Sequence, residues 1–175
     1  MRVLVAYASD HGSTRGLAER IGSVLAGQGL QAEVRSFSSV DAPVGYDAFV
    51  LGSAVHDQKW LPAAQDFIHE HAEALARRPV WLFSVGMPGA LRWPLSQFAT
   101  AEEPKLLAQF EGVIRPVAHR LFSGVIAPGH LPGTGRVLFK AIGGRYGDYR
   151  NWPEIEAWAR QIAAAVPPRP GTDQG

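Results

Sequence analysis

Residues 2–14 read RVLVAYASDHGST, an apolar run that leads into a short polar loop. The run from Val3 to Ala8 predicts a buried strand, and apolar residues at helical spacing predict a helix from Thr14 to Gly27. A strand whose carboxyl end opens directly onto a helix offers unpaired backbone N–H groups and the positive end of the helix dipole to an anion. The loop therefore predicts a phosphate site, although Ser and Thr are also ordinary capping residues at a helix start.

Short apolar runs and helical patterns alternate along the rest of the chain. Strands are expected at 2–8, 32–37, 47–53, 79–85 and 117–126, and helices at 14–27, 61–76, 102–113 and 153–165. This alternation is typical of a parallel sheet covered by helices on both faces. Two runs, 48–53 and 80–85, are continuously apolar, as in central strands. The sequence therefore predicts an α/β fold with a doubly wound, five-stranded parallel sheet.

In a sheet of this class, ligands bind outside the carboxyl ends of the strands, where the strand order reverses. The loops concerned follow the first, third and fourth strands, at 9–14, 53–61 and 84–93. Trp60 and Trp93 would either be partly exposed there beside a flat conjugated ligand or cap the core. The fingerprints Gly-x-Gly-x-x-Gly and Gly-x-x-x-x-Gly-Lys are missing after the first strand, so a single phosphate is the better match.

The length of 175 residues and a hydrophobic content of 46% predict one domain, over residues 1–165. The segment 127–147 is rich in Gly and Pro and is interpreted as an insertion after or within the fifth strand. Residues 166–175 are expected to form a disordered tail. The sequence shows neither a signal-peptide pattern nor an apolar run of membrane-spanning length, so a cytoplasmic protein is expected.

The composition excludes several classes of chemistry. The chain has no cysteine, which rules out disulfides, thiolate zinc sites and cysteine nucleophiles, so redox chemistry would need a bound cofactor. His69 and His71 would point to different faces of a helix, and no metal site is predicted. A formal net charge of +1 gives no electrostatic basis for nucleic-acid binding.

Basic residues are concentrated between 111 and 150. Within this stretch, residues 131–146 alternate apolar and basic side chains. Such a segment suits peripheral contact with the inner face of a membrane, cover over a pocket, or a helix packed on the domain.

Four stretches, 3–14, 50–61, 82–87 and 147–159, together resemble the flavodoxin family, which binds FMN. The likeness is strongest to the menaquinone-dependent protoporphyrinogen oxidase branch of that family, through SDHGST at 9–14, GSAV at 52–55 and GDYRNW at 147–152. The resemblance covers most of the chain. It implies the strand order 2-1-3-4-5 and an insertion of the long-chain type near the substrate side.

The resemblance also implies which residues bind FMN. The phosphate loop would comprise Ser9, Asp10, His11, Gly12, Ser13 and Thr14. The flavin ring would lie between a first group, Ser53, Ala54, Val55, His56 and Trp60, and a second group, Ser84, Val85, Gly86, Met87 and Gly89. If a porphyrinogen is the substrate, its propionates would pair with Arg92, Arg136, Lys140 or Arg145.

Two departures from the flavodoxin pattern bear on function. His11 stands where flavodoxins usually carry Thr or Ser, so an imidazole replaces one phosphate hydroxyl. Carrier flavodoxins tend to be strongly acidic, whereas this chain is nearly neutral, which favours an enzyme.

The resemblance therefore implies an FMN-dependent oxidoreductase that passes electrons from a reduced small molecule, such as protoporphyrinogen IX, to a quinone-type acceptor. The flavin would carry the chemistry, and no side chain is predicted to act as a catalytic acid. A one-electron carrier and a flavin-free interaction module remain as alternatives. The sequence does not predict the oligomeric state.

Overall fold

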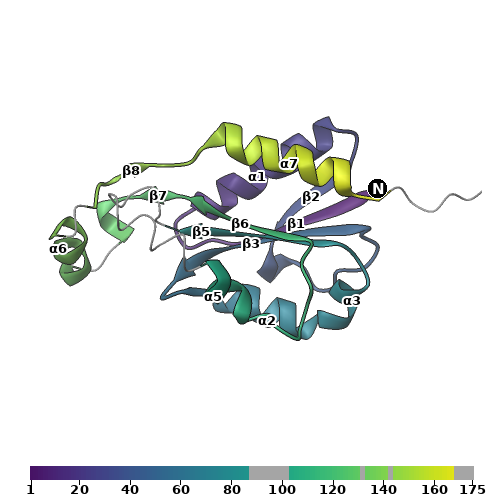
Figure 1. The fold of residues 1–175 in the computed structure, drawn as a ribbon, viewed down its shortest axis with the longest axis horizontal. Helices are drawn as coiled ribbons and strands as arrows, with labels where there is room; N and C mark the ends of the chain where they lie inside the picture. Colours follow the sequence, from purple (N-terminus) through teal and green to yellow (C-terminus); the bar gives the residue numbers. More distant parts are fainter. Residues whose placement is uncertain (87–102, 131–132, 142–143, 168–175) are drawn as a thin grey trace, which may run out of the picture.

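The computed structural model describes residues 1–86, 103–130, 133–141 and 144–167 (Figure 1). Met87, Gly89, Arg92 and Trp93, together with residues 168–175 of the expected tail, lie outside the described residues.

A five-stranded parallel sheet forms the centre of the fold, in the order β2-β1-β3-β5-β6. Its strands are β1 (Arg2–Ala8), β2 (Gln31–Ser36), β3 (Ala48–His56), β5 (Val80–Gly86) and β6 (Ala118–Ser123). A two-residue strand, β4 (Lys59–Trp60), pairs antiparallel with the end of β3. Without this short addition the order is 2-1-3-4-5, so the predicted α/β topology is confirmed.

Helices cover both faces of the sheet (Figure 1). α1 (Ser13–Gly27) and α7 (Trp152–Ala165) pack on one face, and α2 (Pro62–Glu70), α3 (Ala72–Ala76) and α5 (Glu103–Ala108) lie on the other, near the short 3-10 helix η1 (Phe37–Ser39). α7 begins with a capping interaction, because the Asn151 side chain accepts a hydrogen bond from the Glu154 N–H at 3.4 Å.

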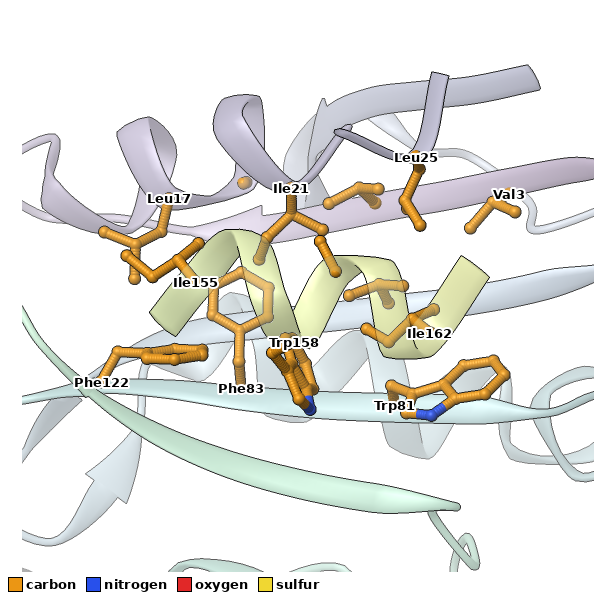
Figure 2. Close-up of a cluster of buried hydrophobic side chains, with 14 of the residues drawn as sticks. Val3, Leu17, Ile21, Leu25, Trp81, Phe83, Phe122, Ile155, Trp158 and Ile162 are labelled. Carbon is orange, nitrogen blue, oxygen red and sulfur yellow. The ribbon is translucent and has the colours of Figure 1, made fainter. Parts of the chain in front are cut away.

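Each face of the sheet has its own apolar core. On the α1 and α7 side, the rings of Phe83 and Phe122 meet the Trp158 indole edge-on at centroid distances of 6.2 and 5.5 Å (Figure 2). Gly52 of β3 lies beneath the Phe83 ring, since a Cβ at this position would come within 2.0 Å of a ring carbon. Val166, assigned to the tail from the sequence, packs in the same cluster as Trp158.

The segment after the fifth strand leaves the sheet. β7 (Val125–Ile126) pairs antiparallel with β8 (Gly147–Asp148), and η3 (Pro128–His130) and α6 (Gly133–Ala141) lie between them in the chain. In Figure 1 these elements extend past the carboxyl ends of the parallel strands. Among the helices in the described parts of the chain, none combines the length and hydropathy needed to cross a bilayer.

Three predicted elements are divided, shortened or interrupted in the structure. The helix expected at 61–76 is divided into α2 and α3 at His71, and the helix expected at 102–113 ends at Ala108 and continues as turns. The strand expected at 117–126 is interrupted at Gly124. There, the Gly124 N–H donates to the Gly86 carbonyl at 3.0 Å, and a Cβ would lie 2.8 Å from the Val85 side chain.

Candidate functional site

A cavity of about 400 Å³ opens at the carboxyl edge of the sheet. Its volume falls within the range of about 300–1,000 Å³ that is usual for small-molecule sites. The β1–α1 loop, the ends of β3 and β5, and β7 supply the lining: Ser9, Asp10, His11, Ser13, Thr14, Ala54, Val55, His56, Asp57, Val85, Gly86, Gly124, Val125 and Ile126. The structure therefore brings together residues from all three loops singled out in the sequence.

The β1–α1 loop is held by its own hydrogen bonds. The Ser9 hydroxyl oxygen accepts from the Gly12 N–H at 3.0 Å. Gly12 has φ of 84°, a left-handed conformation that glycine adopts without strain, and α1 begins at the next residue. Gly12 has no side chain to cap the helix, so the first N–H groups of α1 receive no side-chain cap from it, and Ser13 and Thr14 of this first turn line the cavity.

The position of Thr14 is the strongest single indication that the cavity binds a polar ligand. The residue is only 1% exposed and lines the cavity. Its hydroxyl oxygen, Oγ1, is buried and has no hydrogen-bond partner among the described residues. Leaving such a group unpaired costs about 1–3 kcal/mol. A polar ligand at the start of α1 would remove this cost, and the phosphate of FMN fits the donors present.

Ser13 connects the phosphate loop to the segment after β6. Its hydroxyl oxygen accepts from the Val125 N–H at 3.0 Å and retains its own proton for donation. β7 therefore forms one wall of the cavity. At the far end of the same segment, Arg150 lies over the Trp152 ring at 4.6 Å and pairs with Asp148. Hydrogen bonding from the Arg150 side chain holds the pKa of Asp148 below its ordinary value.

Charged and titratable side chains gather at the mouth of the cavity. Asp10 lies between two imidazoles, with its Oδ2 atom 3.2 Å from Nε2 of His11 and 3.7 Å from Nε2 of His56. Asp57 follows in the tight turn between β3 and β4, where Asp57 and Gln58 have φ of 49° and 62°. In the regions that the structure describes, no cluster of His, Asp and Glu has an arrangement that could hold a metal ion.

Of the two placements that the sequence left open for Trp60, the structure has the one in which the indole caps the core. β4 folds back on β3 with Trp60 opposite Val55, and this pairing turns the indole into the core, where it is 2% exposed. Its Nε1–H donates to the Ser84 hydroxyl at 2.7 Å, and its ring meets Phe110 edge-on at 5.0 Å. Trp60 therefore does not line the cavity but anchors the hairpin whose other strand does.

Ser53 and Ser84 also face inward and are fully buried. The Ser53 hydroxyl donates to the Ala54 carbonyl at 2.8 Å and accepts from the Leu61 N–H at 2.9 Å. The Ser84 hydroxyl lies 2.9 Å from Nε2 of His119 in addition to its bond with Trp60. Both serines are absent from the cavity lining, and each holds the β3–β4 hairpin in place.

Two of the basic residues expected to bind substrate, Lys140 and Arg145, do not line the cavity. Lys140 is exposed on α6, and Arg145 is exposed shortly before β8. Arg136 lies within α6, and its side chain is outside the described part. Three further lining residues, Gly124, Val125 and Ile126, lie outside the loops predicted for the site, and Asp57 lies within the predicted loop 53–61 but was not named as a cofactor contact. Only Gly124, a glycine within an apparent strand, carried a signal that could have located the end of β6.

Comparisons with known proteins agree on the fold. The family described as "Flavodoxin domain" matches residues 4–142. A protein of Escherichia coli strain K12 named protoporphyrinogen IX dehydrogenase [quinone] is 24% identical over 180 residues, which cover 93% of this chain and 95% of that protein.

Solved flavodoxins superpose over nearly the whole chain. Oxidised flavodoxin 1 from Bacillus cereus gives a TM-score of 0.61 at 11% identity, over 95% of this chain and 100% of that one. A flavodoxin from the domain Archaea gives 0.58 at 18% identity, over 95% and 99%. At these identities the superpositions establish the arrangement of the backbone.

Proposed function

The chain belongs to the flavodoxin domain family, and we propose that it binds FMN and acts as an FMN-dependent oxidoreductase. The observation that carries the proposal is the Thr14 hydroxyl, which is buried in the wall of a cavity at the start of α1 and has no hydrogen-bond partner among the described residues. A ligand with a phosphate group supplies the acceptor that this hydroxyl lacks.

Two groups of residues would hold the cofactor. Ser13 and Thr14, with the N–H groups of the first turn of α1, would hold the phosphate. The flavin ring would lie between the segment 54–57 and the end of β5 at Val85 and Gly86. When bound, FMN supplies the capacity to accept electrons from a reduced compound and to deliver them to an acceptor.

The residues of this chain would bind and orient the flavin and keep water from one side of it. Trp60 and Ser84 fix the hairpin that carries 54–57, because the indole donates to a hydroxyl on a neighbouring core strand. β7 closes the cavity from another side through its hydrogen bond to Ser13. No side chain needs to act as an acid or base in this account.

We further propose a reduced small molecule as the electron donor and a quinone as the acceptor, with protoporphyrinogen IX as the first donor to test. The printed name of the E. coli relative and the nearly neutral charge of this chain support an enzyme over an acidic electron carrier. Lys140 and Arg145 would meet the propionates, from a segment that lies beyond the carboxyl edge of the sheet (Figure 1). In this proposal the enzyme works in the cytoplasm, and the segment 131–146 contacts the inner face of the membrane.

An anaerobic turnover assay tests the activity. The FMN-loaded chain is mixed with protoporphyrinogen IX and a water-soluble quinone, and porphyrin fluorescence is followed against loaded protein and FMN alone. An enzyme produces porphyrin at a rate proportional to loaded protein, with one quinol formed for each pair of electrons removed. If loaded protein adds nothing to the rate with free FMN, the enzymatic proposal is wrong and a carrier is favoured.

A further inference from the structure

The cavity has an unusual charge pattern for a site that would receive a phosphate. Its lining contains two carboxylates, Asp10 and Asp57, and two imidazoles, His11 and His56, and among the described lining residues there is no Lys or Arg. When both imidazoles are neutral, the lining carries a charge of −2. When both are protonated, it is neutral.

The two imidazoles act on the same carboxylate. The Asp10 Oδ2 atom lies 3.2 Å from Nε2 of His11 within the phosphate loop and 3.7 Å from Nε2 of His56, which reaches across from the end of β3. Half to two thirds of each imidazole is covered, so their charges are only partly screened by water. Protonation of either imidazole places a cation beside the carboxylate closest to the start of α1.

Other cations nearby are already engaged or face elsewhere. Arg15, in the first turn of α1, donates to Glu19 at 2.8 Å and does not line the cavity. Arg150 pairs with Asp148. Lys59 lies opposite His56 in the β3–β4 hairpin, is exposed, and is also absent from the lining. Among the lining residues that the structure describes, the two histidines are therefore the side chains that can offset the carboxylates.

We propose that Asp10, His11 and His56 make the binding of the FMN phosphate proton-linked, so that FMN binds most tightly near pH 6 and more weakly at alkaline pH. The inference rests on the proposed FMN site, and it adds that these three side chains determine which charge state of the phosphate binds most tightly. Imidazoles lose their proton between pH 5 and 8, and a phosphate monoester approaches a charge of −2 over the same range. Raising the pH therefore adds repulsion from Asp10 and Asp57 at the moment when the phosphate charge increases.

The test compares FMN with riboflavin, which has the same ring and no phosphate. Dissociation constants for both are measured by flavin fluorescence with the full chain between pH 6 and 8.5. The quantity of interest is the ratio of the riboflavin Kd to the FMN Kd, because it cancels pH effects on the ring site. We expect this ratio to fall about 10-fold over that range, which corresponds to a change of about 1.4 kcal/mol in the interaction of the phosphate with the charged side chains.

Matched variants assign the effect. His11→Gln and His56→Gln combined keep hydrogen-bonding groups at both positions but cannot titrate, so the ratio should become flat across the pH range. Asp10→Asn removes the repelling charge and should raise FMN affinity most at pH 8.5. His69→Gln changes an exposed histidine of α2 that does not line the cavity, and should behave like the unmodified chain.

Calorimetry provides a second measurement that does not depend on fluorescence. FMN titrations near pH 7 in two buffers of different ionisation enthalpy should show net proton uptake, and riboflavin titrations should show none. If both flavins bind and their Kd ratio is constant from pH 6 to 8.5, the inference is wrong while the FMN site stands. If neither flavin binds at any pH, the proposed function itself is wrong.

Discussion

Replacing Thr14 with Val should change stability and ligand binding in opposite directions. The two side chains have nearly the same shape, and the substitution deletes a buried hydroxyl that has no partner among the described residues. Burying such a group unpaired costs about 1–3 kcal/mol, so the FMN-free variant should be more stable by about 1 kcal/mol. The same change removes a hydrogen bond to a charged phosphate, worth about 1.5–3 kcal/mol, which corresponds to roughly 10- to 150-fold weaker FMN binding.

Urea unfolding of the FMN-free protein, followed by circular dichroism, measures the first effect, and flavin fluorescence titration measures the second. Thr14→Ser retains the hydroxyl and should bind FMN far better than Thr14→Val. Thr134→Val, on the exposed surface of α6, controls for the general effect of the substitution. If Thr14→Val lowers the free energy of unfolding and leaves the FMN dissociation constant unchanged, the Thr14 hydroxyl does not bind the phosphate.

Three further predictions concern the sheet, an ion pair and the proposed substrate contacts. Gly52→Ala would place a Cβ about 2 Å from the Phe83 ring, so urea unfolding should show a free energy of unfolding lower by about 1–3 kcal/mol. Adding Phe83→Leu to this variant should recover part of the lost stability. If the two substitutions instead lower the free energy of unfolding additively, the contact with Phe83 is not the cause. Asp148→Asn should lower the free energy of unfolding by about 0.5 kcal/mol at pH 7, since the pair is half-exposed. Because the pKa of Asp148 is depressed in the folded protein, the stability that the ion pair adds is present above the ordinary pKa of Asp and is lost as the pH falls below about 4. Equal free energies of unfolding for Asp148→Asn and the unmodified chain at pH 7 would contradict this prediction. In the porphyrinogen assay, the double variant Lys140→Ala and Arg145→Ala should raise KM about 10-fold with little change in kcat, and an unchanged KM would remove both residues from the substrate site.

The parallel sheet and the location of the cavity follow closely from sequence patterns, whereas the strand order was implied by the resemblance to flavodoxins. Continuous apolar runs at 48–53 and 80–85 predicted strands buried on both sides, and the structure places them at the centre of the sheet. The loop after β1 could be located because a strand, a glycine and a helix follow one another directly. These features depend on local patterns, which sequence periodicity records.

The orientation of Trp60 and the path of β7 could not be predicted in the same way. The turn before Trp60 has Asp57 and Gln58 at positive φ, where a glycine or asparagine would normally mark a hairpin. Without that mark, the sequence left open whether the tryptophan lies exposed beside a ligand or packs in the core. The departure of β7 from the sheet depends on hydrogen bonds to Ser13 and on pairing with β8, which are contacts between segments distant in the chain.

The charge pattern of the site could be predicted only in part from the sequence. The sequence showed His11 in the phosphate loop, but gave no means of placing His56 beside the same carboxylate. That arrangement depends on the register of β3 beside β1, which pairs Ala8 with Ser53 and brings the end of β3 level with the loop. The effect of having His11 in the phosphate loop can therefore be inferred only when its neighbours in space, Asp10 and His56, are known.

The first measurement to make is a titration of the flavin-free, 175-residue chain with FMN at pH 6.5. Flavin fluorescence and the visible absorption band of the cofactor are followed together, with riboflavin as the comparison ligand. If the cavity is an FMN site, FMN should show saturable quenching with a perturbed spectrum and should bind more tightly than riboflavin. Absence of saturable quenching by FMN would contradict the proposal that the cavity binds FMN, and it would favour a flavodoxin-like protein that serves as an interaction module without flavin.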